Sequence, residues 1–160
     1  MNTLNLKKAT RTDINDVVEM ISSLYEHEEL PCDRFTMRKN VDKLIQQSDL
    51  GEVLIIRNGV SVIGYAIIVY FYSLELGGLS ALLDEFFIKE SCRSQGFGNI
   101  AMTELFDLCR QKGLAAVQLE VLNQNAHAKS LYLKKGFTVR DRSLMVRSFD
   151  SDESQLRKAS

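Results

Sequence analysis

Apolar residues recur along the chain with two periods, and each period predicts a different kind of element. A spacing of three or four positions, typical of a helix with one buried face, begins after residue 12 or 13 with Ile14, Val17, Val18 and Ile21. The same spacing returns three more times, and each of these later segments ends at a glycine. The further helices are expected over residues 33–50, 94–112 and 126–135.

Shorter segments rich in β-branched and aromatic residues predict strands. Residues 52–57 and 60–73 flank Asn58-Gly59, a pair that favours positive φ at both positions and so predicts a tight antiparallel hairpin. Further strands are expected over residues 4–9, 82–89, 115–122 and 137–149. The resulting order, β-α-α-β-β-β-α-β-α-β, predicts a mixed α/β fold (an α+β mixed sheet) with helices on both faces.

Length and composition fit a single folded domain. The 160 residues, 45% of them hydrophobic, are too few for two ordinary domains, so we expect one domain over 1–149 and a polar tail over 150–160. The 20 basic and 21 acidic residues form no basic stripe, which argues against a nucleic-acid partner. The apolar stretch 66–72 is too short to span a bilayer, so no membrane partner is expected.

The three cysteines lack the spacing of a disulfide framework or a zinc site. Their odd number favours a reducing compartment, and therefore a cytoplasmic protein without a bound metal. Cys109 lies on the apolar face of an expected helix and should pack in the core. Cys92 lies in a candidate site loop, but no histidine stands beside it, so we do not expect a nucleophile there.

The segment that follows strand 82–89 has the features of a phosphate-binding loop. Gly96 and Gly98 let the chain turn tightly and let a ligand approach the backbone, although close packing alone also explains two such glycines. The N–H groups of residues 95–99 are expected to point, unpaired, out of the helix start, where aligned dipoles favour an anion. The residues expected to hold a pyrophosphate are Arg93, Ser94, Gln95, Gly96, Phe97, Gly98 and Asn99.

The same glycines also fit a dinucleotide-binding fingerprint. The stretch from Gly96 to Ala101 matches G-x-G-x-x-A, and Glu120 follows at about the distance of the ribose-binding acid in that motif. Three features argue against it. The glycines come four residues too late after the strand, the preceding hairpin is antiparallel, and too few residues follow Glu120 for the remaining parallel strands.

Two motifs together resemble the GNAT N-acetyltransferase superfamily. Arg93-x-x-Gly96-x-Gly98 is similar to its acetyl-CoA pyrophosphate signature, R/Q-x-x-G-x-G/A. The stretch Asn125-x-x-Ala128-x-x-Leu131-Tyr132-x-x-x-Gly136-Phe137 is similar to its last helix, and the element order agrees. Residues 65–73 and 83–88 resemble, more loosely, the diamine and thialysine acetyltransferase branch, but the two tryptophans of that branch are missing from residues 119–125.

The resemblance implies an acetyl-CoA-dependent N-acetyltransferase that acetylates a primary amine by direct attack. It implies that Tyr132 protonates the departing thiolate, and that the CoA arm lies where strands 82–89 and 115–122 splay apart. Main-chain groups of Phe87 and Ile88 and the side chain of Asn125 would then bind the pantetheine, although Asn125 also suits a helix N-cap. Many members of the family are dimers, which implies a homodimer.

A carboxylate is expected to take the proton from the acceptor amine or to bind its cationic form. Asp84 and Glu85 lie on the strand before the loop, and Glu120 lies on the neighbouring strand. Because side chains alternate along a strand, only one of Asp84 and Glu85 is expected to face the acceptor. The acidic run 26–29, which includes His27, could form an acidic acceptor wall or a solvated helix end.

Three functions of different classes therefore stay open. The first is an acetyltransferase that acts on a polyamine, an amino-acid side chain, an antibiotic or a protein terminus. The second is a catalytically idle protein that binds acyl-CoA, against which Tyr132 argues because an idle copy has no need of an acid. The third is a dinucleotide-binding module.

Overall fold

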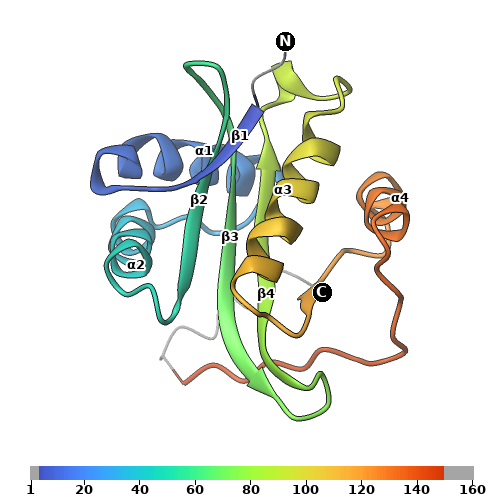
Figure 1. The fold of residues 1–160 in the computed structure, drawn as a ribbon. Helices are drawn as coiled ribbons and strands as arrows, with labels where there is room; N and C mark the ends of the chain where they lie inside the picture. Colours follow the sequence, from blue (N-terminus) through green and yellow to red (C-terminus); the bar gives the residue numbers. More distant parts are fainter. Residues whose placement is uncertain (1–3, 150–160) are drawn as a thin grey trace.

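The computed structural model describes residues 4–149, and the polar tail expected over 150–160 lies outside the described residues. A five-stranded sheet forms the centre, with its strands in sequence order from β1 to β5 (Figure 1). The first four strands are antiparallel neighbours, whereas β5 pairs with β4 in parallel. The strands are β1 (Leu4–Lys8), β2 (Gly51–Asn58), β3 (Ser61–Ser73), β4 (Gly78–Ile88) and β5 (Val117–Leu119).

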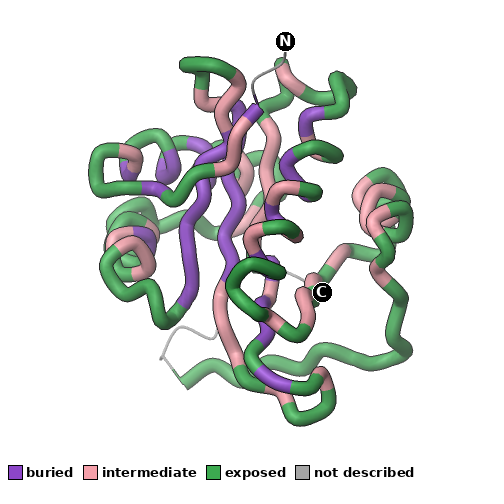
Figure 2. Tube along the Cα trace, viewed as in Figure 1, coloured by how far each residue is buried: buried purple, intermediate pink, exposed green. Residues whose placement is uncertain are grey.

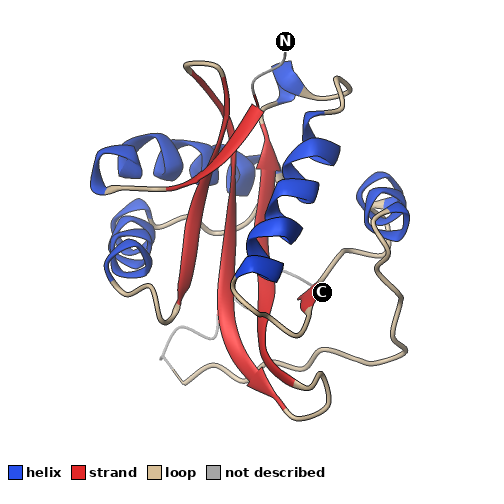
Figure 3. Ribbon diagram, viewed as in Figure 1, coloured by secondary structure: helices blue, strands red, loops and turns tan. Residues whose placement is uncertain are grey.

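Helices cover both faces of the sheet, as the sequence predicts (Figure 3). On one face lie α1 (Ile14–His27) and α2 (Arg34–Gln46), and Asp33 caps α2 by accepting a hydrogen bond from the N–H of Phe35. On the other face lies α3 (Phe97–Gln111), and α4 (Ala126–Lys134) stands beside it. Two short 3₁₀ turns, Arg11–Asp13 and Glu90–Cys92, lead into α1 and toward α3.

The core has one layer on each side of the sheet, and β2 contributes to both. Val53 and Ile55 pack with α1 and α2, whereas Leu54 and Ile56 face the α3 side. Since side chains alternate along a strand, a strand covered on both faces needs an unbroken apolar run, and β2 has one. Figure 2 shows the buried residues concentrated in these central strands and on the inner sides of α1 and α3.

The hairpin between β2 and β3 forms one residue later than the dipeptide suggests. Asn58 pairs with Ser61, so the two-residue loop is Gly59-Val60. Only Gly59 has a positive φ, at 60°. Glycine at the first position of a two-residue hairpin loop meets the same conformational need, so the hairpin is confirmed and the positive φ expected for Asn58 is wrong.

Two expected strands differ in the structure. The strand expected over 115–122 shortens to β5, and residues 137–149 form no strand. A strand needs a partner for its backbone groups, and β5 offers only three residues along its edge. The segment is instead held by Arg140 and Arg142, which both bind the carboxylate of Glu75 in the β3–β4 turn.

None of the helices within residues 4–149 has the length and apolar character needed to cross a bilayer.

Candidate active site

A β-bulge places Asp84 and Glu85 together at the edge of β4. Ile67 of β3 lies opposite Glu85, but Ile68 lies opposite Leu83, so Asp84 is an extra residue in β4. A bulge interrupts the alternation of side chains along a strand. Both carboxylates therefore line the same cleft, and the expectation that only one of them faces it is wrong.

The cleft opens where β4 and β5 separate, as the sequence predicts. Their pairing extends only from Ala81 and Val117 to Leu83 and Leu119. Beyond this point lies a cleft of about 320 Å³, lined from α1 and the loop after it, from β4, from the chain after β5, and from α4. Because α1 and α4 lie on opposite faces, the cleft reaches through the plane of the sheet.

Glu85 is fixed by two tyrosine hydroxyl groups. Tyr25 of α1 donates to its Oε1 at 2.6 Å, and Tyr65 of β3 donates to its Oε2 at 2.7 Å. Burial raises the pKa of Glu85; the two hydrogen bonds lower it, and the charges of Asp84 and Glu28 raise it further. Burial and the Glu85 carboxylate raise the pKa of both tyrosines, so both stay protonated donors.

Asp84 differs from Glu85 in having no side-chain hydrogen bond within the described residues. Its side chain is open to solvent at the cleft, yet the protein around it raises its pKa by desolvation. Glu120 also lines the cleft, but it follows the end of β5 and does not lie on the strand. Because its pKa is raised and its carboxyl group has no hydrogen-bond partner within the described residues, Asp84 is suited to proton transfer.

The cleft is acidic. Glu28, Asp84, Glu85 and Glu120 line it, and no lysine, arginine or histidine is among the described lining residues. Of the acidic run 26–29, only Glu28 reaches the cleft, and His27 is exposed to solvent. Within residues 4–149, no three histidine, cysteine, aspartate or glutamate side chains gather closely enough to hold a metal ion.

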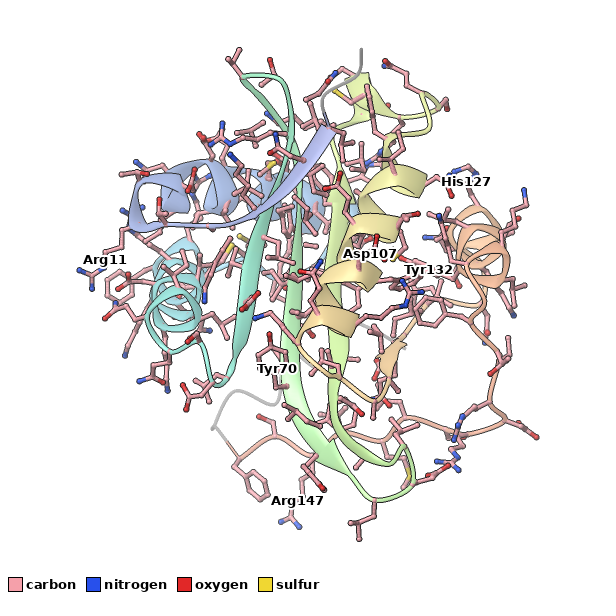
Figure 4. The ribbon with its side chains drawn as sticks, in the orientation of Figure 1. Arg11, Tyr70, Asp107, His127, Tyr132 and Arg147 are labelled. Carbon is pink, nitrogen blue, oxygen red and sulfur yellow. The ribbon has the colours of Figure 1, made fainter. Side chains whose placement is uncertain are left out.

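Tyr132 lines the α4 side of the same cleft. Its ring points from α4 toward α3 and packs edge-on against Phe137, with 5.7 Å between the ring centroids (Figure 4). Burial raises the pKa of Tyr132, so the hydroxyl keeps its proton. The position that the resemblance assigns to an acid thus holds a protonated phenol that lines the same cleft as Asp84 and Glu85.

The glycine loop forms a group of unpaired N–H donors before α3. Gly96 is the N-cap with φ 81°, and Ser94 also has a positive φ, of 61°. The N–H groups of residues 94–98 have no acceptor among the described residues, but that of Asn99 binds the carbonyl of Gly96 at 3.1 Å. The group of unpaired N–H donors expected over residues 95–99 is therefore present over residues 94–98, and we call it a nest. Such a nest at a helix start favours an anion.

Gly98 and Gly96 differ in what a side chain would meet there. A Cβ at Gly98 would lie 3.8–4.0 Å from side-chain atoms of Phe86, Ile88 and Leu131, which is ordinary contact. A Cβ at Gly96 would meet nothing within 4 Å. Packing therefore leaves room for a small side chain at Gly98, whereas Gly96 needs glycine because of its positive φ.

Arg93 lies against the end of β4. Its Nε donates to the carbonyl of Ile88 at 2.9 Å, and its guanidinium lies 5.6 Å from the ring centre of Phe87. The N–H of Lys89 binds β3, so the backbone groups of Phe87, two residues earlier, also point toward β3. The main-chain groups on the free edge of β4 therefore belong to Phe86 and Ile88.

Asn125 is the N-cap of α4, and its Oδ1 accepts from the N–H of Ala128 at 3.1 Å. Its side chain also lines the cleft, so both roles expected from the sequence are compatible. Cys109 packs in the core as predicted, and burial raises the pKa of its thiol to about 11, which leaves it unreactive.

Sequence reasoning did not find Tyr25 and Tyr65 as site residues. Tyr65 occupies a fully buried position in an apolar strand, and Tyr25 lies on the apolar face of α1. A buried tyrosine hydroxyl usually needs a hydrogen-bond partner, and this was the one signal available.

Residues 14–137 match the acetyltransferase (GNAT) family. The chain belongs to that family. The GNAT chain is 23% identical to a thialysine N-epsilon-acetyltransferase from Bos taurus in an alignment of 144 residues, and the match covers 82% of this chain and 82% of the other.

Solved structures show the same fold. A possible acetyltransferase from Clostridium difficile 630 superposes with a TM-score of 0.81 at 17% identity, over 92% of this GNAT chain and 98% of the other. A predicted acetyltransferase from Clostridium acetobutylicum, solved with acetyl-CoA, gives a TM-score of 0.74 at 15% identity, over 91% and 96%. The antiparallel strand order and this family membership overturn the dinucleotide-binding interpretation of the glycine loop.

Proposed function

We propose that the protein transfers an acetyl group from acetyl-CoA to a cationic primary amine. One observation carries this proposal. A single cleft through the sheet brings an unoccupied carboxyl group, Asp84, and a protonated phenol, Tyr132, to one place beside the free edge of β4.

The cofactor would bind on the α3 side. The N–H groups of residues 94–98 and the guanidinium of Arg93 suit the pyrophosphate. The main-chain groups of Phe86 and the N–H of Ile88 suit the amides of the pantetheine, which would extend along β4 like an added strand. The carbonyl of Ile88 already accepts from Arg93. This path ends at the cleft, where the thioester would meet Tyr132 and Asn125.

The acceptor amine must lose a proton to attack the thioester. A lysine-like amine has a pKa near ~10.4, so deprotonation at pH 7 costs about 4–5 kcal/mol. Asp84 takes this proton, directly or through water, because both oxygens of Glu85 already accept hydrogen bonds. The neutral nitrogen then bonds to the thioester carbon and loses its second proton to water. The tetrahedral intermediate expels the thiolate, Tyr132 protonates the sulfur, and a proton from water restores the Tyr132 hydroxyl.

The cleft also restricts the acceptor. Four carboxylates without a basic residue favour a cationic amine, such as a polyamine or a lysine-like side chain. An acceptor that carries a free carboxylate near its amine would meet this negative charge unpaired. We therefore expect diamines to be better substrates than free amino acids, including thialysine.

The test is acetyl-CoA turnover with a panel of diamines, basic peptides, free amino acids and neutral amines. Acetylation of diamines but not of neutral amines supports the proposal. Stabilisation of the protein by acetyl-CoA without turnover of any amine would instead identify an idle acyl-CoA-binding protein. If a neutral or anionic acceptor were acetylated faster than the diamines, the proposed acceptor class would be wrong but the acetyltransferase activity would stand.

A further inference from the structure

The charge of Glu85 has no basic partner among residues 4–149. The groups that face it are Tyr25 from α1, Tyr65 from β3, Asp84 from its own strand, and Glu28 just beyond α1. Two of these groups are neutral donors and two are acids. A partly buried carboxylate among acids is costly unless donors hold it, because desolvation and like charges both disfavour the ionised form.

We propose that Tyr25 and Tyr65 are positioning residues that keep Glu85 ionised and fixed, so that Glu85 serves as the counter-charge for the acceptor ammonium while Asp84 takes the proton. This inference rests on the proposed function. It assigns different tasks to two adjacent carboxylates that the bulge brings into one cleft.

The two tyrosines suit this task because they come from different elements. Tyr65 is fully buried in β3, 20 positions before Glu85, and its ring packs against Phe87 at 5.7 Å. Tyr25 lies 60 positions before Glu85, on the helix that ends at the cleft. Each hydroxyl fixes one carboxylate oxygen, and neither hydroxyl ionises near neutral pH because its pKa is raised.

Hydrogen bonds from neutral donors stabilise the carboxylate without cancelling its charge. A lysine or arginine in place of the tyrosines would form an ion pair with Glu85 and neutralise the charge that attracts a substrate cation. Glu85 is therefore held as an anion without a positive partner in the described part of the chain, and an ammonium group in the cleft completes the pair.

The experiment uses the variants Tyr25→Phe and Tyr65→Phe, each of which removes one hydroxyl. Tyr72→Phe is the matched control, because Tyr72 lies on the same strand β3 but is 73% exposed. The titration of Glu85 is followed by carbon-13 NMR of glutamate-labelled protein, with its signal identified by its loss in Glu85→Gln. Circular dichroism tests whether each variant is folded. If Tyr65→Phe fails to fold, Tyr25→Phe still tests the inference, because Tyr25 is only half-buried.

We expect the titration midpoint of Glu85 to move to higher pH in both variants, since each loses a donor that favours the charged form, and to stay unchanged in Tyr72→Phe. The probe 1,4-diaminobutane should shift the Glu85 signal in the wild-type protein. For that amine, KM at pH 7 should rise about tenfold in either variant with kcat little changed, and the difference should shrink at pH 9.

The inference would be overturned if the titration midpoint of Glu85 stayed unchanged in both variants. It would also be overturned if 1,4-diaminobutane did not shift the NMR signal of Glu85. An equal rise in KM at pH 7 and pH 9 would also overturn it, because a merely structural role predicts no pH dependence. The midpoint and the probe response need no turnover. If both behave as expected while the protein acetylates no amine, the role of the tyrosines stands and the proposed function fails.

Discussion

Lys112 and Glu52 form an ion pair in which the carboxylate is almost completely buried. The Nζ of Lys112, at the C-terminal end of α3, lies 2.6 Å from Oε1 of Glu52 on β2, whose side chain is 4% exposed. Lys8 of β1 approaches the same oxygen at 3.5 Å. The pair thus ties the C-terminal end of α3 to the sheet.

Removal of Lys112 should lower the stability of the fold. Lys112→Met leaves Glu52 with Lys8 alone, and an underpaired buried carboxylate should lower the free energy of unfolding by about 1–3 kcal/mol. Arg110→Ala is the control: its pair with Asp107, also at 2.6 Å, is exposed in the same helix turn and should contribute at most about 0.5 kcal/mol. Urea unfolding measures the stability of both variants. Equal losses would contradict the idea that leaving the buried carboxylate of Glu52 underpaired is what destabilises Lys112→Met.

The Lys112 pair also predicts a pH dependence. The hydrogen bond to Glu52 raises the pKa of Lys112 above its ordinary 10.5. Its stabilising contribution is therefore fully present below the unfolded pKa and is lost as pH rises through the folded pKa. The stability difference between wild type and Lys112→Met should be constant from pH 7 to 9 and should shrink above about pH 10.5.

Gly96→Val should weaken acetyl-CoA binding, whereas the control Gly113→Val should leave that binding unchanged. Gly96 and Gly113 stand at the two ends of α3, both with positive φ and both with open space where a Cβ would lie. Valine should cost each site about 1–2 kcal/mol of stability through backbone strain. Only Gly96→Val should raise the Kd for acetyl-CoA, by about tenfold or more, in calorimetry. Equal affinities in the two variants would place the pyrophosphate elsewhere.

Tyr132→Phe should affect the chemical step more than binding. Loss of a general acid should lower kcat by about a hundredfold, whereas the Kd for acetyl-CoA should stay within about a factor of two. Because the pKa of Tyr132 is raised above its ordinary 10.0, wild-type kcat should show no alkaline decline from this group below that pH. An unchanged kcat would assign Tyr132 to packing against Phe137.

Asp84→Asn should separate activity from stability. It should lower kcat/KM about a hundredfold at pH 7, and Glu120→Gln, a second cleft carboxylate, should change it much less. Since desolvation raises the folded-state pKa of Asp84, its charge costs stability at neutral pH and costs none once pH falls below the unfolded pKa. The Tm of Asp84→Asn should therefore exceed that of wild type at pH 7 but not near pH 3. A larger loss in Glu120→Gln would make Glu120 the base.

The sequence by itself determined the helices, the four antiparallel strands, the glycine loop before α3 and the position of Tyr132 on α4. These follow from local information: the spacing of apolar residues, glycines at turns, and a cap such as Asp33 that bonds to the residue two positions on. The separation of β4 and β5 was also predictable, because it accompanies the resemblance to the family.

Only the tertiary structure decided how the carboxylates of the cleft are placed and hydrogen-bonded. The bulge at Asp84 depends on the register between β3 and β4, and alternation along one strand cannot reveal an extra residue in its pairing. The hydrogen bonds from Tyr25 and Tyr65 join residues 60 and 20 positions from Glu85. The absence of a strand over 137–149 has the same origin, since a strand forms only where another chain segment offers backbone partners, and no local pattern specifies that partner.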